Sequence, residues 1–91
     1  MKTYTITIKE TNTTDGQTLT FEMQDRENLF AIVDALKGKS TLDENDATRL
    51  GVALRLLGPV MMKDRKHPLF ADFFPHFKDF MTNLKSKVKN R

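Results

Sequence analysis

The amino-acid sequence predicts an α+β domain, in which an N-terminal two-stranded antiparallel β-hairpin is followed by three to four α-helices packed on one face of it. Residues 3–9 and 17–23 alternate apolar and polar side chains with the period of two that a half-buried strand requires. From residue 25 onward the apolar residues instead recur every three or four positions, as they do along one face of a helix.

The hairpin is expected over residues 3–23. The stretch TNTTDG between the two strands is rich in turn-forming residues. One face of the hairpin is rich in threonine, which is typical of a sheet face in contact with water. The other face is apolar and consists of Tyr4, Ile6, Ile8, Leu19, Phe21 and Met23. Because an isolated hairpin is barely stable in water, we expect helices or a second subunit to cover this face.

The first helix is expected at about residues 25–38. Asp25 is a favourable N-cap residue, because its side chain can accept hydrogen bonds from the first backbone N–H groups. Gly38 lies where many helices end in a left-handed residue. The apolar positions between them are Leu29, Phe30, Ile32, Val33 and Leu36.

The second helix is expected at about residues 42–65. Thr41 and Glu44 have the spacing of a capping box at its start. The pair Gly58-Pro59 interrupts its apolar stripe, and proline removes one hydrogen bond of a helix and clashes one turn back. A kink or a break is therefore expected at this pair.

The third helical segment is expected at about residues 68–88. Pro68 and Pro75 each fit the first turn of a helix, which predicts two helices that meet at a bend. The basic end, residues 85–91, is expected to fray. The segment also holds a phenylalanine stripe with helical spacing, made of Phe70, Phe73, Phe74, Phe77 and Phe80.

Composition limits the classes of protein to consider. The 91 residues form a single domain, 1–91, and 38% hydrophobic with 30% charged residues is typical of a folded chain. Cysteine is absent, which excludes disulfides and thiolate chemistry. The N-terminus lacks the apolar stretch of a signal peptide, and no run of eighteen apolar residues predicts a membrane span. A cytoplasmic location is the default expectation.

The stretch KHPLFADFFPHF is where a reactive site could be sought. His76 follows Asp72 by four residues and precedes Asp79 by three, so the three could share a helix face. However, the segment offers no serine or cysteine nucleophile and no spacing typical of metal ligands. His67 is better explained as a helix N-terminal residue bonded locally to backbone. We therefore expect no catalytic, metal-binding or cofactor-binding residue, and no enzyme.

The apolar surplus in a short chain favours an interaction surface. The phenylalanine stripe, the Met61-Met62 pair and the apolar face of the hairpin are more than we expect one small monomer to bury. This favours a self-associating protein-interaction module, a homodimer with an apolar patch shared across a two-fold axis. Its protein partner cannot be named from the sequence. The expected surface consists of Met61, Met62, Lys63, Arg65, Lys66, Phe70, Phe73, Phe74, Phe77 and Lys78.

The alternative function is association with nucleic acid through the basic C-terminal end. Residues 61–91 carry eight Lys and Arg against three Asp and Glu, and clustered cations can contact phosphates. The cations nearest the end alternate along the chain, so they form no single helical stripe, and no aromatic residues interleave with them to stack on bases. They are Lys85, Lys87, Lys89 and Arg91.

The stretches LFAIVDALKG, GVALRLLG and VMMKDRKHPLF, with the later FKDFM and its following LK, together resemble a family of small bacterial proteins known as a domain of unknown function. The resemblance covers nearly the whole chain. It implies a compact domain of a hairpin plus helices and a bacterial, cytoplasmic origin, and it implies no activity and no functional residue. Members of the family tend to carry an acidic residue where this chain has Pro59, so the resemblance leaves the continuity of the second helix open.

Overall fold

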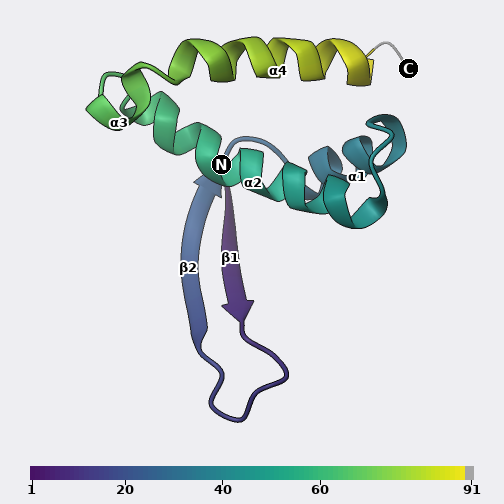
Figure 1. Cartoon of the computed structure of the whole chain (residues 1–91), viewed down its shortest axis with the longest axis vertical. Coiled ribbons are helices and arrows are strands. Elements are labelled where there is room, and N and C mark those ends of the chain that lie inside the picture. The colour runs from purple at the N-terminus through teal and green to yellow at the C-terminus, as the bar shows by residue number, and fades with distance from the viewer. Residues whose placement is uncertain (90–91) are drawn as a thin grey trace.

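The computed structural model of the protein describes residues 1–89. It confirms the predicted class and order, since an antiparallel two-stranded hairpin is followed by four helices (Figure 1). The elements are β1 (Lys2–Lys9), β2 (Thr18–Asp25), α1 (Leu29–Lys39), α2 (Glu44–Lys63), α3 (Pro68–Ala71) and α4 (Phe74–Lys89).

The register of the hairpin places the two sets of alternating residues as predicted. On one face the apolar residues lie opposite one another in three pairs, Tyr4 with Met23, Ile6 with Phe21, and Ile8 with Leu19. On the other face Thr20 lies opposite Thr7, and their hydroxyl oxygens are 3.5 Å apart. The hairpin therefore has one apolar and one threonine-rich face.

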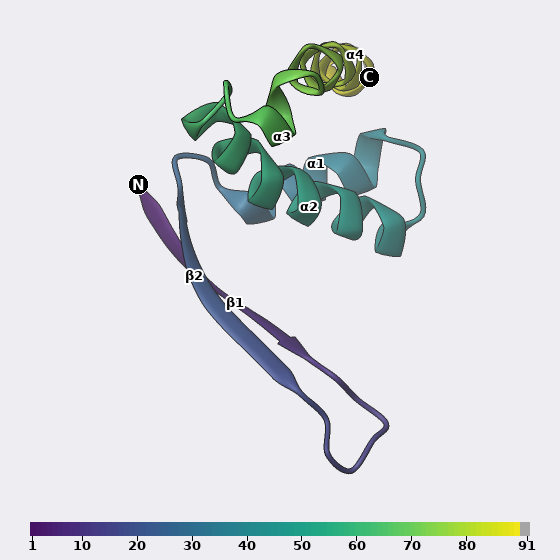
Figure 2. The ribbon, with the colours of Figure 1, turned by 60° about the vertical axis from the view of Figure 1, so that its left-hand side comes forward.

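The helices do not cover the apolar face of the hairpin, and the expectation that they pack on it is wrong for most of its length. Both views show the hairpin projecting away from the helices, with only its base beside them (Figures 1 and 2). The side chains of Ile8, Leu19 and Phe21 are exposed. The physical reason is that α1 and α2 bury their apolar stripes against each other and against α4, so the outer part of the sheet receives no cover.

Helices α1 and α2 approach each other closely at Gly51. A Cβ atom added there would lie 3.0 Å from Cγ2 of Val33 and 3.1 Å from Cδ1 of Leu36. Val33 and Leu36 are buried, as are Ala47 and Leu54 on α2. The absence of a side chain at Gly51 thus allows the two helices to pack at short range.

The ends of α1 differ from the prediction. Asp25 is the last residue of β2, and the N-cap is Asn28, whose Oδ1 accepts from the backbone N–H groups of Phe30 and Ala31 at 3.0 and 3.2 Å. Gly38 lies inside the helix, which ends at Lys39 with Ser40 as its C-cap and without a left-handed glycine. Asp25 does not cap the helix because its carboxylate is paired with Arg55, 30 positions further along the chain.

Helix α2 starts later than predicted and continues through its proline. The prediction of a capping box formed by Thr41 is wrong, because Thr41 lies before the helix and has a left-handed φ of 67°. The N-cap is Asp43, which accepts from the backbone N–H of Asp46 at 2.8 Å. Pro59 lies inside the helix, which runs without a break from Glu44 to Lys63.

The third predicted segment is divided into α3 and α4, which meet at a bend. Pro68 is the first residue of α3 and Pro75 the second of α4, as expected for prolines in first turns. Helix α4 continues to Lys89, fraying of the basic end stays a prediction, and residues 90–91 lie outside the described residues. Helix α4 packs on α2 through a core of Leu54, Met61 and Phe77, flanked by Leu50, Phe70, Phe74, Met81 and Leu84.

Candidate interaction surfaces

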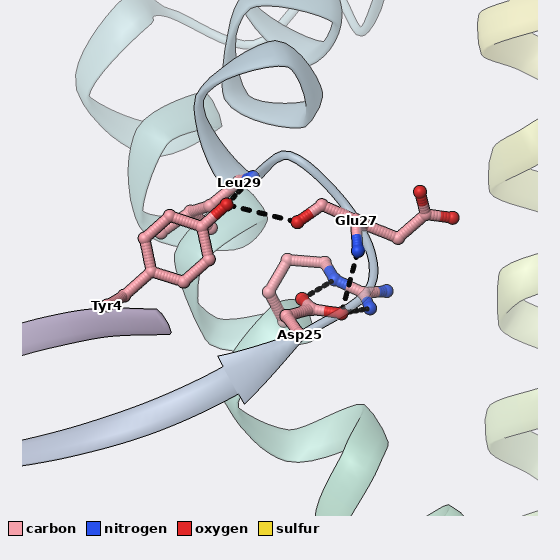
Figure 3. Close-up of polar contacts among 5 residues, drawn as sticks. Tyr4, Asp25, Glu27 and Leu29 are labelled. Carbon is pink, nitrogen blue, oxygen red and sulfur yellow. Dashed lines mark hydrogen bonds and ion pairs between the residues drawn. The ribbon is translucent and has the colours of Figure 1, made fainter. Parts of the chain in front are cut away.

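A part-buried ion pair joins the hairpin to the helices. Nε of Arg55 on α2 donates to Oδ2 of Asp25 at 2.8 Å, and Nη2 donates to Oδ1 at 2.6 Å (Figure 3). The Asp25 side chain is 3% exposed, and its Oδ1 also accepts from the backbone N–H of Glu27 at 3.1 Å. The hydrogen bonds from Arg55 lower the pKa of Asp25 below its ordinary value, and the same contact raises the pKa of Arg55.

Tyr4 makes a second connection at the base of the hairpin. Its hydroxyl donates to the carbonyl oxygen of Glu27 and accepts from the backbone N–H of Leu29, both at 3.0 Å (Figure 3). Its ring meets Phe30 edge-on, with 6.0 Å between the centroids. Strand β1 is thus tied to the start of α1, and β2 is tied to α2. These two connections set the direction of the hairpin.

Local sequence patterns predict neither connection. The pattern around Asp25 predicts a helix cap, and the alternation around Tyr4 predicts only an apolar strand residue. One signal was present in the sequence: Arg55 stands inside the apolar run ALRLL, where a charged side chain needs a partner. The pattern did not show which acid would be that partner.

The uncovered part of the hairpin offers an apolar surface, here called the hairpin face and consisting of Ile6, Ile8, Leu19 and Phe21. Ile8, Leu19 and Phe21 are 56%, 57% and 37% exposed. Such side chains are individually ordinary on a protein surface, but here they are adjacent across two strands. The hairpin face is therefore a candidate contact surface.

A second apolar surface lies between α1 and α4, with α2 beneath. This helical groove has a volume of about 620 Å³. Its polar lining comprises Glu27, Lys39, Arg55 and Lys85, and of these Arg55 is already paired with Asp25. Its apolar lining comprises Ile32, Ala35, Leu36, Leu54, Met81, Leu84 and Val88. The groove arises from three helices together, so no local sequence pattern predicted it.

The apolar residues of the predicted interaction surface do not lie together on the outside. Met61 is fully buried and Phe77 nearly so, and these two belong to the core instead of a surface. Phe70 and Phe74 are half-buried against that core. Of the apolar residues in the predicted surface, Met62 and Phe73 are exposed to solvent.

The basic residues of the predicted surface are exposed around the corner between α2 and α4. The guanidinium carbon of Arg65 lies 5.7 Å from the centre of the Phe74 ring, a cation–π contact. This contact joins the end of α2 to the start of α4 and is local to the corner. The exposed basic residues are Lys63, Arg65, Lys66 and Lys78.

The histidines occupy ordinary helical positions. Nδ1 of His67 accepts from the backbone N–H of Leu69 at 3.1 Å, which confirms the predicted local bond at the start of α3. His76 is exposed on α4. Within residues 1–89, no group of three or more histidine, aspartate or glutamate side chains is placed to hold a metal ion.

The basic C-terminal end shows two exposed cations on α4. Lys85 and Lys87 are about 200° apart around the helix axis, because each residue turns an α-helix by about 100°. They thus point to different sides of the helix. The side chain of Lys89 and the whole of Arg91 lie outside the described residues, and nucleic-acid association stays a prediction.

No helix among the described residues combines the length and apolar character that crossing a membrane requires.

The fold and these surfaces define a small α+β domain in which a β-hairpin projects from a four-helix body. The family profile that matches residues 2–86 is a domain of unknown function with a solved structure, DUF3861, and the chain belongs to this family. It is similar to a crystal structure of a protein of unknown function (eca1910) from Pectobacterium atrosepticum SCRI1043, with 38% identity and a TM-score of 0.86 over 93% of this chain and 97% of that chain. No curated protein matches the sequence.

Proposed function

We propose that the protein is a small, non-catalytic protein-interaction module that self-associates through the hairpin face. The surface area of the chain carries this proposal. A compact monomer of 10.5 kDa exposes about 5,400 Å², whereas this chain exposes 7285 Å². The excess of about 1,900 Å² is more than the ~800 Å² that each partner buries in an ordinary stable interface.

The dimensions of the chain support the same conclusion. The radius of gyration is 15.1 Å, whereas a compact domain of this length has about 12 Å. The projecting hairpin contributes to this difference (Figure 2). Because a free two-stranded hairpin is marginally stable, its outer half gains most from a contact that covers the apolar side.

The chemistry of the hairpin face suits contact with protein. It contains aliphatic and aromatic side chains next to one another and no charged side chain, since Glu22, which stands between Phe21 and Met23 in the chain, belongs to the opposite face. Burial of such side chains contributes roughly 1.5–3 kcal/mol each when it is complete. The threonines of the two strands, together with Lys9 and Glu22, lie on the opposite face, where they keep their water.

The oligomeric state tests this proposal. Sedimentation velocity or light scattering at several concentrations is expected to give a dimer for the unmodified protein. Leu19→Asp places a carboxylate in the hairpin face and is expected to give a monomer whose circular dichroism retains the helices. Thr20→Asp is the matched control, because it places the same group one residue away on the threonine-rich face, and the dimer should persist. A monomer at every concentration contradicts the proposal.

A further inference from the structure

The hairpin face and the helical groove are two apolar surfaces that the same chain leaves open. The groove lies between α1 and α4, and its apolar floor comes from all three neighbouring helices. The hairpin face lies on the part of the sheet that points away from those helices (Figures 1 and 2). A contact in which a hairpin face fills a helical groove would cover both apolar surfaces.

The hairpin of the same chain cannot reach the groove. The paired Asp25 and Arg55 fix the end of β2 on α2, and the Tyr4 hydroxyl fixes β1 at the start of α1. From this base the hairpin runs away from α4, and its tip lies at the far end of the molecule (Figure 1). The occupant of the groove must therefore come from another molecule.

Stacking of two hairpin faces alone gives too little contact. Eight-residue strands are about 26 Å long, and two strands are about 10 Å wide, so one face has a projected area of about 260 Å². The accessible area of a rough surface exceeds its projection, but a threefold excess would be needed to reach the ~800 Å² per partner of an ordinary interface. Insertion of each hairpin into the groove of the other copy adds the groove surface to the contact.

The charges of the two surfaces are complementary. The turn at residues 10–17 carries Glu10 and Asp15 and no basic residue. The rim of the groove carries Lys39 from α1 and Lys85 from α4, both exposed, with Glu27 as its acidic residue. Opposite charges at the rim of an interface favour encounter and fix the register of the partners.

We propose that the occupant of the helical groove is the hairpin of a second copy of this chain, with its hairpin face on the apolar floor and its acidic turn beside Lys39 and Lys85. A two-fold axis makes the contact reciprocal, so each copy gives one hairpin and receives one. This proposal rests on the self-association proposed above and adds the surface that receives the hairpin.

Charge reversal tests the arrangement. One variant carries Glu10→Lys and Asp15→Lys in the turn, and the other carries Lys39→Glu and Lys85→Glu at the rim. Each alone should dimerise about tenfold more weakly than the unmodified protein, since like charges then meet. A mixture of the two should form mixed dimers of nearly full affinity, because each contact again joins opposite charges. Lys66→Glu with Lys78→Glu, exposed lysines that do not line the groove, is the control and should leave dimerisation unchanged.

Chemical cross-linking gives a second measurement that does not depend on affinity. The chain has no cysteine, so Asp15→Cys and Lys85→Cys introduce unique thiols. With a flexible bis-maleimide, a mixture of the two is expected to give cross-links between Cys at 15 in one copy and Cys at 85 in the other. A dimer in which only identical positions cross-link, or in which charge reversal has no effect, overturns the groove contact and leaves self-association standing. A monomer overturns both.

Discussion

Arg55 on α2 donates two hydrogen bonds to the carboxylate of Asp25 at the end of β2, from Nε at 2.8 Å and from Nη2 at 2.6 Å. The two residues are 30 positions apart in the chain, and the contact joins the sheet to the helices where few other contacts do so. A charge-assisted pair with two parallel hydrogen bonds restricts the relative orientation of its two side chains and also stabilises their contact. The angle at which the hairpin leaves the helical body therefore depends on this pair.

Replacement of Arg55 by alanine should destabilise the protein by about 3 kcal/mol, because it leaves the nearly buried carboxylate of Asp25 without its cation. The control is Arg49→Ala, an exposed arginine on the same helix, which should change the unfolding free energy by less than about 0.5 kcal/mol. Urea denaturation at a fixed protomer concentration measures both. Equal, small effects of the two substitutions would contradict a structural role for the pair.

The stabilisation from Asp25 should disappear in acid. Its pKa is lowered in the folded protein, so its contribution is fully present above the unfolded pKa of about 3.9 and is lost as the pH falls through the lower folded value. Arg55 stays protonated throughout. The difference in unfolding free energy between the unmodified protein and Asp25→Asn should be constant above about pH 5 and should shrink below about pH 4. A difference that grows on acidification would have the wrong sign for this linkage.

The Tyr4 hydroxyl should stabilise the base of the hairpin. Tyr4→Phe keeps the ring against Phe30 but leaves the N–H of Leu29 and the carbonyl of Glu27 without this partner. We expect a loss of about 1–2 kcal/mol. Thr20→Val also removes a hydroxyl, one whose contact with Thr7 is long and exposed, and should change stability by less than about 0.5 kcal/mol. Thermal unfolding followed by circular dichroism compares the two variants, and similar losses would argue against the connection.

Local patterns predicted the fold well where the chain's own periodicity decides it. The alternation of Tyr4, Ile6 and Ile8 predicted the faces of the hairpin, and the positions of Pro68 and Pro75 predicted the bend before α4. The prediction of helix ends was weaker, because caps are short-range signals that a distant partner can override. Asp25 had the chemistry of a cap, but Arg55 holds it in the sheet instead.

The candidate surfaces were harder to predict for a related reason. A helical stripe identifies residues that need cover, but not which of them receive it, so Met61 and Phe77 were assigned to a surface although they form the core. The exposure of Leu19 depends on where the helices stand relative to the hairpin. That relation is set by Asp25, Arg55 and Tyr4 across the fold, and no window of the sequence contains all three.

Gly51 on α2 and Gly38 on α1 should respond in opposite ways to the same substitution. At Gly51 an added Cβ would lie 3.0 Å from Cγ2 of Val33 and 3.4 Å from its Cα, and neither the backbone nor a β-branched side chain can yield easily. At Gly38, apart from its chain neighbours and the backbone of its own helix, no heavy atom lies within 4 Å of the added Cβ. Alanine favours a helix over glycine by up to about 1 kcal/mol at either position.

Gly38→Ala should therefore stabilise the protein by about 0.5–1 kcal/mol. Gly51→Ala should destabilise it by about 1 kcal/mol, because overpacking of about 1–3 kcal/mol exceeds the helix propensity gained. Denaturant midpoints measured at one protomer concentration compare the pair, which share the chemical change and a helical position. If Gly51→Ala were as stabilising as Gly38→Ala, α1 and α2 would have to lie further apart than the contact between Gly51 and Val33 places them.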